Sequence, residues 1–204
     1  LVQRFWDPLV FAVGCLEINT DSGNKVLGGR GVGKFSRGFL VHQRAKDQNL
    51  ETTLWVTAGS GAFRKSIWHR LGGLDTLFRP AYEEDRDLSF NALKSGYKLV
   101  FEPKSQVTHH HETTNLSTFG KRRIAIMSFK NQLLFIWKNI SSFNLLAAHL
   151  LWLPYHLVFT SVRSQGAFLL GFLWALTQLP ETLLSRYRIS KLWKLNDEQV
   201  IASV

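Results

Sequence analysis

The character of this chain changes near residue 120, and this change limits the folds that it can adopt. Up to about residue 115, short apolar runs alternate with Gly, Pro and charged residues, a pattern typical of a domain that mixes strands and helices. Residues 143–162 then contain no Asp, Glu, Lys or Arg, and residues 166–179 form a second apolar run. We therefore expect an α/β fold over residues 1–115 and a helical region after it.

The two apolar runs predict a helical hairpin over residues 143–180. The first run is just long enough to cross the hydrocarbon core of a bilayer, whereas the second is short. Lys and Arg residues lie in a basic amphipathic linker (116–142) before the hairpin and in a basic tail (181–204) after it. The hairpin is therefore expected to span or dip into the inner membrane from its cytoplasmic face, next to anionic lipid. A very apolar soluble helix pair or a hydrophobic dimer interface would give the same pattern.

The charge of the chain narrows the range of partners. The chain has 25 Lys and Arg residues against 15 Asp and Glu residues, and its net charge of +10 suits nucleic acid, anionic lipid or a phosphorylated substrate. No motif of aromatic and basic residues supports nucleic-acid binding, so no nucleic-acid partner is expected. The single cysteine, Cys15, lies in an apolar run and excludes an internal disulfide framework and a cysteine-based zinc site.

Residues 1–115 predict short elements with glycine-rich ends. Expected strands cover residues 9–16, 54–58 and 99–101, the last ending at Pro103. Expected helices cover residues 62–71, which stop at Gly72, and residues 85–95, which are capped by Gly96. Residues 19–50 are expected to form an irregular, basic excursion. Within it, residues 28–35 nearly match a phosphate-binding P-loop, but Phe35 replaces the required hydroxyl, so a flexible basic loop is expected.

The acidic run before the second helix is the strongest chemical signal. Four of the five residues 83–87 are acidic, the exception being Arg86. The dipole of a helix favours acidic side chains in its first turn, and this effect alone can explain such a run. However, a Gly-Ser-Gly turn, a Gly-Gly-x-Asp turn and three consecutive histidines lie nearby, at expected ends of elements where sites of α/β folds collect. An Asp at this position stays ionised at neutral pH and can accept a proton from an attacking hydroxyl.

Several segments match one known family in order and spacing. They are residues 55–65, 71–75 and 84–88, followed by Gly96-Tyr97, Pro103 and the pair Val107 and His109. Together they resemble the C-terminal half of the inverting family 2 glycosyltransferases, and the resemblance continues more weakly through residues 130–132 into the membrane-associated tail that bacterial members often carry. The resemblance implies that residues 1–115 are the C-terminal part of a GT-A catalytic domain, a nucleotide-sugar-binding α/β sandwich.

The resemblance also implies roles for individual residues. Asp85 matches the catalytic base, and Glu84 would orient the acceptor or the base. His109 falls where some members place a histidine near the diphosphate or its metal. Asp87 is expected to cap the helix. The residues assigned to substrate binding are Gly59, Ser60, Gly61, Arg64 and Asp75.

Transfer of a hexosyl or deoxyhexosyl group with inversion is the activity that the resemblance implies. The donor would be a nucleotide-diphospho-sugar, and the acceptor a hydroxyl of a glycan or lipid-linked molecule in cell-surface polysaccharide synthesis. Family members hold Mg²⁺ or Mn²⁺ with an Asp-x-Asp motif, and none precedes Trp55. We therefore expect the cation to be held mainly by residues upstream, and the chain to be a C-terminal fragment that is inactive alone. A noncatalytic, membrane-associated basic adaptor module is the alternative.

Overall fold

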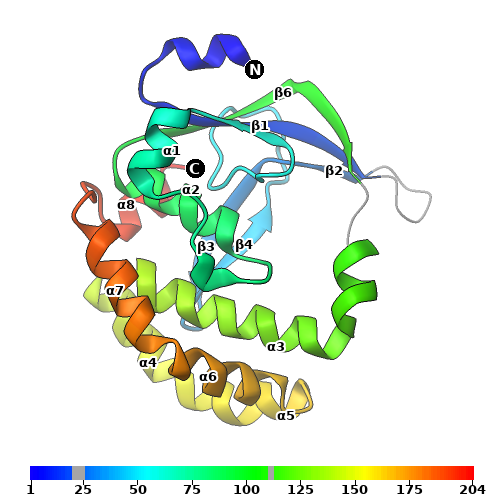
Figure 1. Ribbon diagram of the computed structural model, residues 1–204, viewed down its shortest axis with the longest axis vertical. Helices are drawn as coiled ribbons and strands as arrows, with labels where there is room; N and C mark the ends of the chain where they lie inside the picture. Colours follow the sequence, from blue (N-terminus) through cyan, green and yellow to red (C-terminus); the bar gives the residue numbers. More distant parts are fainter. Residues whose placement is uncertain (20–25, 110–112) are drawn as a thin grey trace.

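The protein combines a mixed β-sheet at one end with a layer of long helices at the other (Figure 1). The computed structural model describes residues 1–19, 26–109 and 113–204. The main sheet is built on β1 (Val10–Asn19), which pairs in parallel with β6 (Lys98–His109). On its other side β1 pairs antiparallel with β5 (Gly61–Phe63) and, further along, with β2 (Val26–Gly28). A separate hairpin consists of β3 (Gly31–Ser36) and β4 (Phe39–Arg44).

Short helices lie between the strands, and long helices follow them. A 3-10 turn (Val2–Trp6) precedes β1. Between β5 and β6 the chain forms α1 (Lys65–Leu71), a 3-10 turn (Thr76–Phe78) and α2 (Glu84–Lys94). After β6 come α3 (Thr113–Asn139), α4 (Phe143–Tyr155), a π-helical turn (His156–Thr160), α5 (Ser161–Arg163), α6 (Ala167–Thr177), α7 (Leu179–Ser190) and α8 (Asp197–Ala202).

Two apolar clusters hold these layers together, and α2 belongs to both. Leu88 of α2 packs in the cluster that contains Phe11 of β1 and Leu99 of β6. Phe90 of α2 belongs to the second cluster, with Leu40 of the hairpin and four consecutive residues (133–136) of α3. Burial of each large apolar side chain contributes about 1.5–3 kcal/mol. The start of α2, which carries the acidic run, is therefore fixed between the sheet and the helical layer.

The predicted helices on either side of residues 72–83 are confirmed with small shifts. The first begins at Lys65 instead of residue 62, because residues 61–63 form β5. It ends at Gly72, which has a left-handed φ of 88°. The second covers Glu84–Lys94, and Gly96 follows it with a φ of 84°. Glycine at these positions avoids the steric cost of a left-handed residue with a side chain.

Two predictions for residues 19–58 are wrong. Residues 54–58 are not a strand, because the Leu54 N–H donates to the Gly31 carbonyl (2.9 Å) and the Val56 N–H donates to a hydroxyl of α2 (3.1 Å) instead of forming a ladder. The expected irregular excursion contains β2 and the β3–β4 hairpin, so the segment 28–35 is not a flexible loop. Arg37 and Gly38 both have positive φ (48° and 80°), as a tight two-residue hairpin turn requires.

The strand predicted at residues 99–101 extends much further, from Lys98 to His109. It passes Pro103 through a bulge, in which residues 103–105 lie between the register pairs Cys15–Glu102 and Leu16–Gln106. A bulge tolerates proline because the extra residues make no ladder hydrogen bonds.

The helical layer contains a long apolar helix with an exposed face. Phe143–Arg163 is continuous over 21 residues, and within the described residues it is the one helix long and apolar enough to cross a membrane by itself. α6 and α7, bent by 65°, would together make a second such segment. Only 11% of the most apolar stretch of Phe143–Arg163 is buried. α6 lies close against α3, since a Cβ at Gly171 would be 2.8 Å from the Ile126 carbonyl oxygen.

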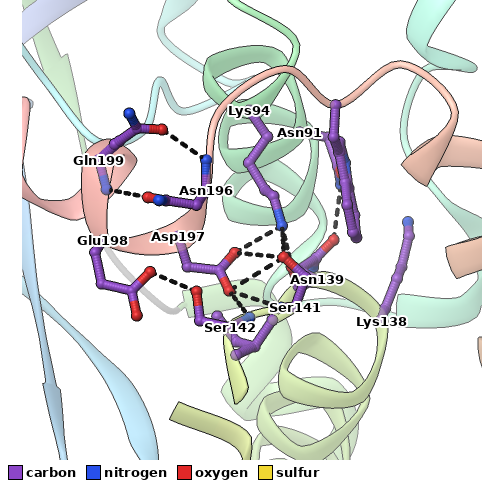
Figure 2. Close-up of polar contacts among 12 residues, drawn as sticks. Asn91, Lys94, Lys138, Asn139, Ser141, Ser142, Asn196, Asp197, Glu198 and Gln199 are labelled. Carbon is purple, nitrogen blue, oxygen red and sulfur yellow. Dashed lines mark hydrogen bonds and ion pairs between the residues drawn. The ribbon is translucent and has the colours of Figure 1, made fainter. Parts of the chain in front are cut away.

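The C-terminal segment returns to the end of α2 (Figure 2). Lys94, the last residue of α2, and Asp197, the first of α8, form an ion pair of 2.6 Å in which both side chains are fully buried. Asp197 also accepts hydrogen bonds from the backbone N–H groups of Ser141 (2.6 Å) and Ser142 (2.7 Å), at the junction of α3 and α4. This ion pair therefore joins α2, α8 and the helical layer.

Candidate functional site

A cavity of about 620 Å³ lies at the N-terminal end of α2. Its walls come from β1, the end of β2, the last residue of β4, Trp55 and the segment 81–86. The acidic run therefore lines a cavity together with residues from distant parts of the chain. The charged side chains in the lining are Glu17, Arg30, Arg44, Glu83, Glu84, Asp85 and Arg86.

The backbone that leads into α2 is strained, and α3 holds it in place. Tyr82 and Glu83 have left-handed φ values of 75° and 74°. For residues with a side chain this conformation costs about 1 kcal/mol or more each, and such strain is concentrated at functional sites. The side-chain amide of Asn131 donates to the carbonyl groups of Phe78 (3.0 Å), Ala81 (2.8 Å) and Tyr82 (2.8 Å). These three bonds fix the turn that presents the acidic run to the cavity.

Lys130 supports the same turn from the adjacent position of α3. Its Nζ donates to the carbonyl groups of Leu77 (3.3 Å) and Arg79 (3.2 Å), and its side chain is fully buried. Burial lowers the pKa of Lys130 to about 8. The family resemblance extends through residues 130–132 but does not indicate this role. The available signal is a Lys-Asn pair within a helix whose neighbouring turns are apolar.

Asp85 lies in the first turn of α2, partly buried in the cavity wall. Burial raises the pKa of Asp85 to about 6; a hydrogen bond from the Ala58 backbone opposes the rise, and the charge of Glu84 adds to it. A carboxyl group with a pKa near 6 is mostly ionised at pH 7 and still basic enough to take up a proton. The position and proton affinity of Asp85 thus fit the base that the sequence predicts.

Two buried polar atoms of the cavity residues have no hydrogen-bond partner among the described residues. They are Oε2 of Glu84 and the hydroxyl of Tyr82. A buried polar atom without a partner is costly, so such atoms in a cavity wall are candidates for contact with a ligand. By contrast Arg86 is already engaged: it pairs with Glu83 (2.6 Å), and its guanidinium lies 5.4 Å from the ring centroid of Trp55.

The Gly-Ser-Gly segment meets the cavity through a hydrogen bond of Ser60. The hydroxyl of Ser60 donates to Oε1 of Glu17, at 2.6 Å. Just before this segment, the backbone of Ala58 lowers the pKa of Asp85, and Thr57 lines the cavity. Residues 57–60 therefore lie beside two carboxylates of the cavity, one on β1 and the other on α2.

The two glycines of this segment have different requirements. A Cβ at Gly61 would lie 2.2 Å from Cγ1 of Val56 and 2.9 Å from the Thr57 carbonyl oxygen, so the close packing of β5 needs glycine there. A Cβ at Gly59 would meet no atom within 4 Å. The open space beside Gly59 is compatible with its predicted place next to a substrate, while Gly61 has a packing reason of its own.

The structure does not bring Asp75 to this cavity. Oδ2 of Asp75 accepts hydrogen bonds from Lys138 Nζ (2.7 Å) and Ser185 Oγ (2.5 Å). Its other oxygen accepts from the Leu77 N–H (2.9 Å) and so caps a 3-10 turn. Asp75 lines a second cavity, of about 650 Å³, between the end of α1 and α7. These contacts join the Gly-Gly turn to α3 and α7, and its substrate role stays a prediction.

Asp87 does not cap α2, contrary to expectation. The N-cap residue is Glu83, whose side chain makes no capping hydrogen bond. Asp87 is 2% exposed, and it accepts hydrogen bonds from Lys138 Nζ (2.7 Å) and Asn139 Nδ2 (2.9 Å). This acidic residue therefore anchors α2 to α3.

Arg64 also lies apart from the cavity. Its guanidinium donates to the carbonyl groups of Phe5 (2.6 Å), Asp7 (2.8 Å) and Val10 (2.9 Å), so it fastens the N-terminal segment to the start of α1. His109 is the last residue of β6, and its side chain lies outside the part of the chain described in full. The metal role assigned to His109 stays a prediction.

The residues of the cavity do not supply a site for the expected divalent cation. Mg²⁺ and Mn²⁺ prefer several oxygen ligands in a compact set. Among the side chains that the structure describes, no group of three or more His, Cys, Asp or Glu residues could hold a metal ion. The expectation that the cation is held mainly by residues upstream stays a prediction.

Comparison with known proteins identifies the family. None of the curated proteins matches this chain. A crystal structure of GalNAc-T7 with UDP, GalNAc and Mn²⁺ is similar, with 18% identity and a TM-score of 0.45, over 65% of this chain and 27% of that chain. The family model described as glycosyl transferase family group 2 matches residues 4–185. The chain therefore belongs to glycosyl transferase family group 2.

Proposed function

We propose that the protein is an inverting glycosyltransferase of the GT-A type, with Asp85 as its catalytic base. Membership of the family supports glycosyl transfer. The observation that carries the proposal is the position of Asp85, in the first turn of α2 and in the wall of a cavity of about 620 Å³. The donor is a nucleotide-diphospho-sugar, and the acceptor is a hydroxyl of a glycan or lipid-linked molecule in cell-surface polysaccharide synthesis.

The proposed reaction is a single displacement. The carboxylate of Asp85 takes the proton of the acceptor hydroxyl while the hydroxyl oxygen forms a bond to the anomeric carbon of the donor. The bond between that carbon and the diphosphate oxygen breaks on the opposite face, and the nucleoside diphosphate leaves with the electron pair. Because attack and departure are on opposite faces, the configuration inverts. The unpartnered Oε2 of Glu84 is placed to accept a hydrogen bond from a further hydroxyl of the acceptor.

The intact protein is expected to release a nucleoside diphosphate from one nucleotide-diphospho-sugar, and to do so faster when a membrane glycan or lipid-linked acceptor is present. A panel of donors with membrane extract as the acceptor source tests this, with release followed by a coupled assay and the product identified by mass spectrometry. NMR of the product should show the anomeric configuration opposite to that of the donor. Retained configuration would exclude the single displacement, and no release with any donor would favour the adaptor alternative.

We further propose that α4 to α7 rest on the cytoplasmic membrane surface. One face of the helix Phe143–Arg163 packs on the protein and includes two hydrogen-bonded histidines: His149, 2% exposed, hydrogen-bonds the Gly38 carbonyl (2.8 Å), and His156 hydrogen-bonds the Arg37 carbonyl (2.8 Å). The opposite side, called here the membrane face, exposes large apolar side chains to 58–83%; they are Phe143, Leu150, Leu151, Val158, Phe159 and Val162. A helix that is packed on the protein along one face and exposes apolar side chains along the other suits the interface better than the bilayer centre.

Vesicle flotation tests the membrane face. The intact protein should float with vesicles that contain anionic lipid, and alkaline carbonate should release it, because interfacial binding lacks the permanence of a spanning helix. Replacing Leu151 and Phe159 by Glu should reduce the floating fraction at least severalfold. Val2→Glu, at an equally exposed apolar residue (80%) near the N-terminus, is the control and should float normally. Equal flotation of the double variant, or resistance to carbonate, would contradict the proposal.

A further inference from the structure

Glu17 is an unassigned carboxylate in the cavity of Asp85. It lies on β1, far in sequence from the acidic run, and is only 7% exposed. A buried carboxylate is costly unless its neighbours donate hydrogen bonds to it. Here the donor is the Ser60 hydroxyl, 2.6 Å from Oε1 of Glu17. A hydrogen bond from a hydroxyl to a carboxylate is stronger than one between neutral groups, so this contact restrains both side chains.

Ser60 belongs to a tight turn that faces the cavity of Asp85. The Ser60 N–H donates to the Thr57 carbonyl (3.2 Å) and closes the turn. Thr57 lines the same cavity as Glu17 and Asp85, and the backbone of Ala58, inside the turn, lowers the pKa of Asp85. Glu17 therefore holds one side of a turn whose other side faces the proposed base.

We propose that Glu17 is a positioning residue of the transfer reaction, which holds the turn at residues 57–60 against Asp85 and adds a negative charge to its cavity. This proposal rests on the proposed function, in which Asp85 is the base. Glu17 acts on the reaction through Ser60 and through its charge, without contact with the reacting atoms.

The two actions of Glu17 on Asp85 have opposite signs. The negative charge of Glu17 favours the protonated form of Asp85 and so raises its pKa, whereas the hydrogen bond from Ala58 favours the ionised form and lowers it. The other charged or titratable groups that line the cavity stay the same when only Glu17 or Ser60 is changed. They are Arg30 before β3, Arg44 on β4, Tyr82 and Glu83 before α2, and Glu84 and Arg86 on α2.

The opposite signs give two variants that should shift the pH profile in opposite directions. Glu17→Gln keeps an oxygen that can accept from Ser60 but removes the charge, so the acid limb of kcat/KM should shift to lower pH by about half a unit, as expected for one charge across a partly solvated cavity. Ser60→Ala keeps the charge but releases the turn, so the Ala58 bond weakens and the acid limb should shift to higher pH. The acid limb of each variant is measured with the intact protein between pH 5 and 8. This range extends about one unit or more on each side of the pKa of Asp85, which is about 6.

Glu51→Gln is the matched control, because Glu51 is a surface residue with a 60% exposed side chain and lies outside the cavity lining. Its profile should match that of the wild type. A structural role alone would change stability or KM but not the acid limb, so unshifted limbs in both variants would overturn the proposal. If Glu17→Gln does not fold, Ser60→Ala decides alone: an upward shift supports the proposal and an unchanged limb overturns it. Absence of transfer by the wild type itself would instead overturn the proposed function, and this proposal with it.

Discussion

Replacing Asp85 by Asn is expected to lower kcat for sugar transfer by about 10²–10⁴-fold, the contribution that a general base usually makes. The Asn side chain has nearly the same shape, and it can accept the hydrogen bond from the Ala58 backbone, but it cannot take a proton from the acceptor hydroxyl. The unbonded oxygen of Glu84 and the rest of the cavity remain in place. The loss should therefore appear mainly in kcat, with KM for the donor changed little.

The pH dependence makes this prediction more specific. Because burial raises the pKa of Asp85 to about 6, kcat/KM of the wild type should fall as the pH drops through 6, when the base becomes protonated. The residual activity of the Asn variant should lack this acid limb. A wild-type profile without an acid limb near pH 6 would contradict the assignment, as would a near-normal rate of the variant.

We expect the Asn variant to stay folded. The pKa of Asp85 is raised in the folded protein from 3.8 to about 6, so its ionisation costs stability as the pH rises through this range. The Asn variant removes that cost, and its melting temperature at pH 7 should equal or exceed that of the wild type. Asp47→Asn, at an exposed carboxylate outside the cavity, is the control and should change neither the rate nor the melting temperature.

The sequence predicts the helix that carries the proposed base because the signals for it are local. The acidic run marks where α2 begins, and Gly96 marks where it ends, within one residue of the prediction. The hairpin of β3 and β4 could not be predicted in this way, because Gly31 and Gly33 weaken the pattern of a strand. Glycine is needed in this strand because of tertiary packing: a Cβ at Gly31 would lie 2.2 Å from the ring of Trp55.

The roles of the acidic residues depend on partners that spacing cannot reveal. Asp75 and Asp87 both pair with Lys138, which follows them by 63 and 51 residues. These pairs make Asp75, a predicted substrate-binding residue, and Asp87, the expected cap of α2, into links between α2, α3 and the Gly-Gly turn. Conversely Glu17 lies within a run of buried β1 residues and gives no sequence signal of its own; only the fold places it beside Ser60.

Replacing Asp197 by Ala is expected to destabilise the protein by about 3–5 kcal/mol, because it leaves the ammonium of Lys94 buried without its counter-charge. Lys94 Nζ keeps only neutral partners: the Asn139 carbonyl (2.8 Å), the Ser141 hydroxyl (2.9 Å) and the ring of Trp193, whose centroid is 3.4 Å away. Few contacts of a domain are worth so large a share of its total stability, which is typically about 5–15 kcal/mol. Urea denaturation of the intact protein in detergent, followed by tryptophan fluorescence, measures the loss.

Three comparisons separate the buried pair from other causes of this loss. Glu198→Ala, at the adjacent but exposed residue of α8, should change the stability by no more than about 0.5 kcal/mol. Replacing both partners, Lys94→Met with Asp197→Leu, should cost less than Asp197→Ala alone, because neither charge is then left buried.

The third comparison is the pH dependence of the stability. Burial raises the pKa of Asp197, but the hydrogen bonds from Lys94 and from the N–H groups of Ser141 and Ser142 outweigh burial and lower this pKa below 3.8. The stabilisation is therefore complete above pH 3.8 and disappears as the pH falls through the lowered pKa, so the difference between wild type and Asp197→Ala should persist at neutral pH and shrink in acid. A constant difference down to strongly acidic pH would show that Asp197 stabilises the fold by packing and not by its charge.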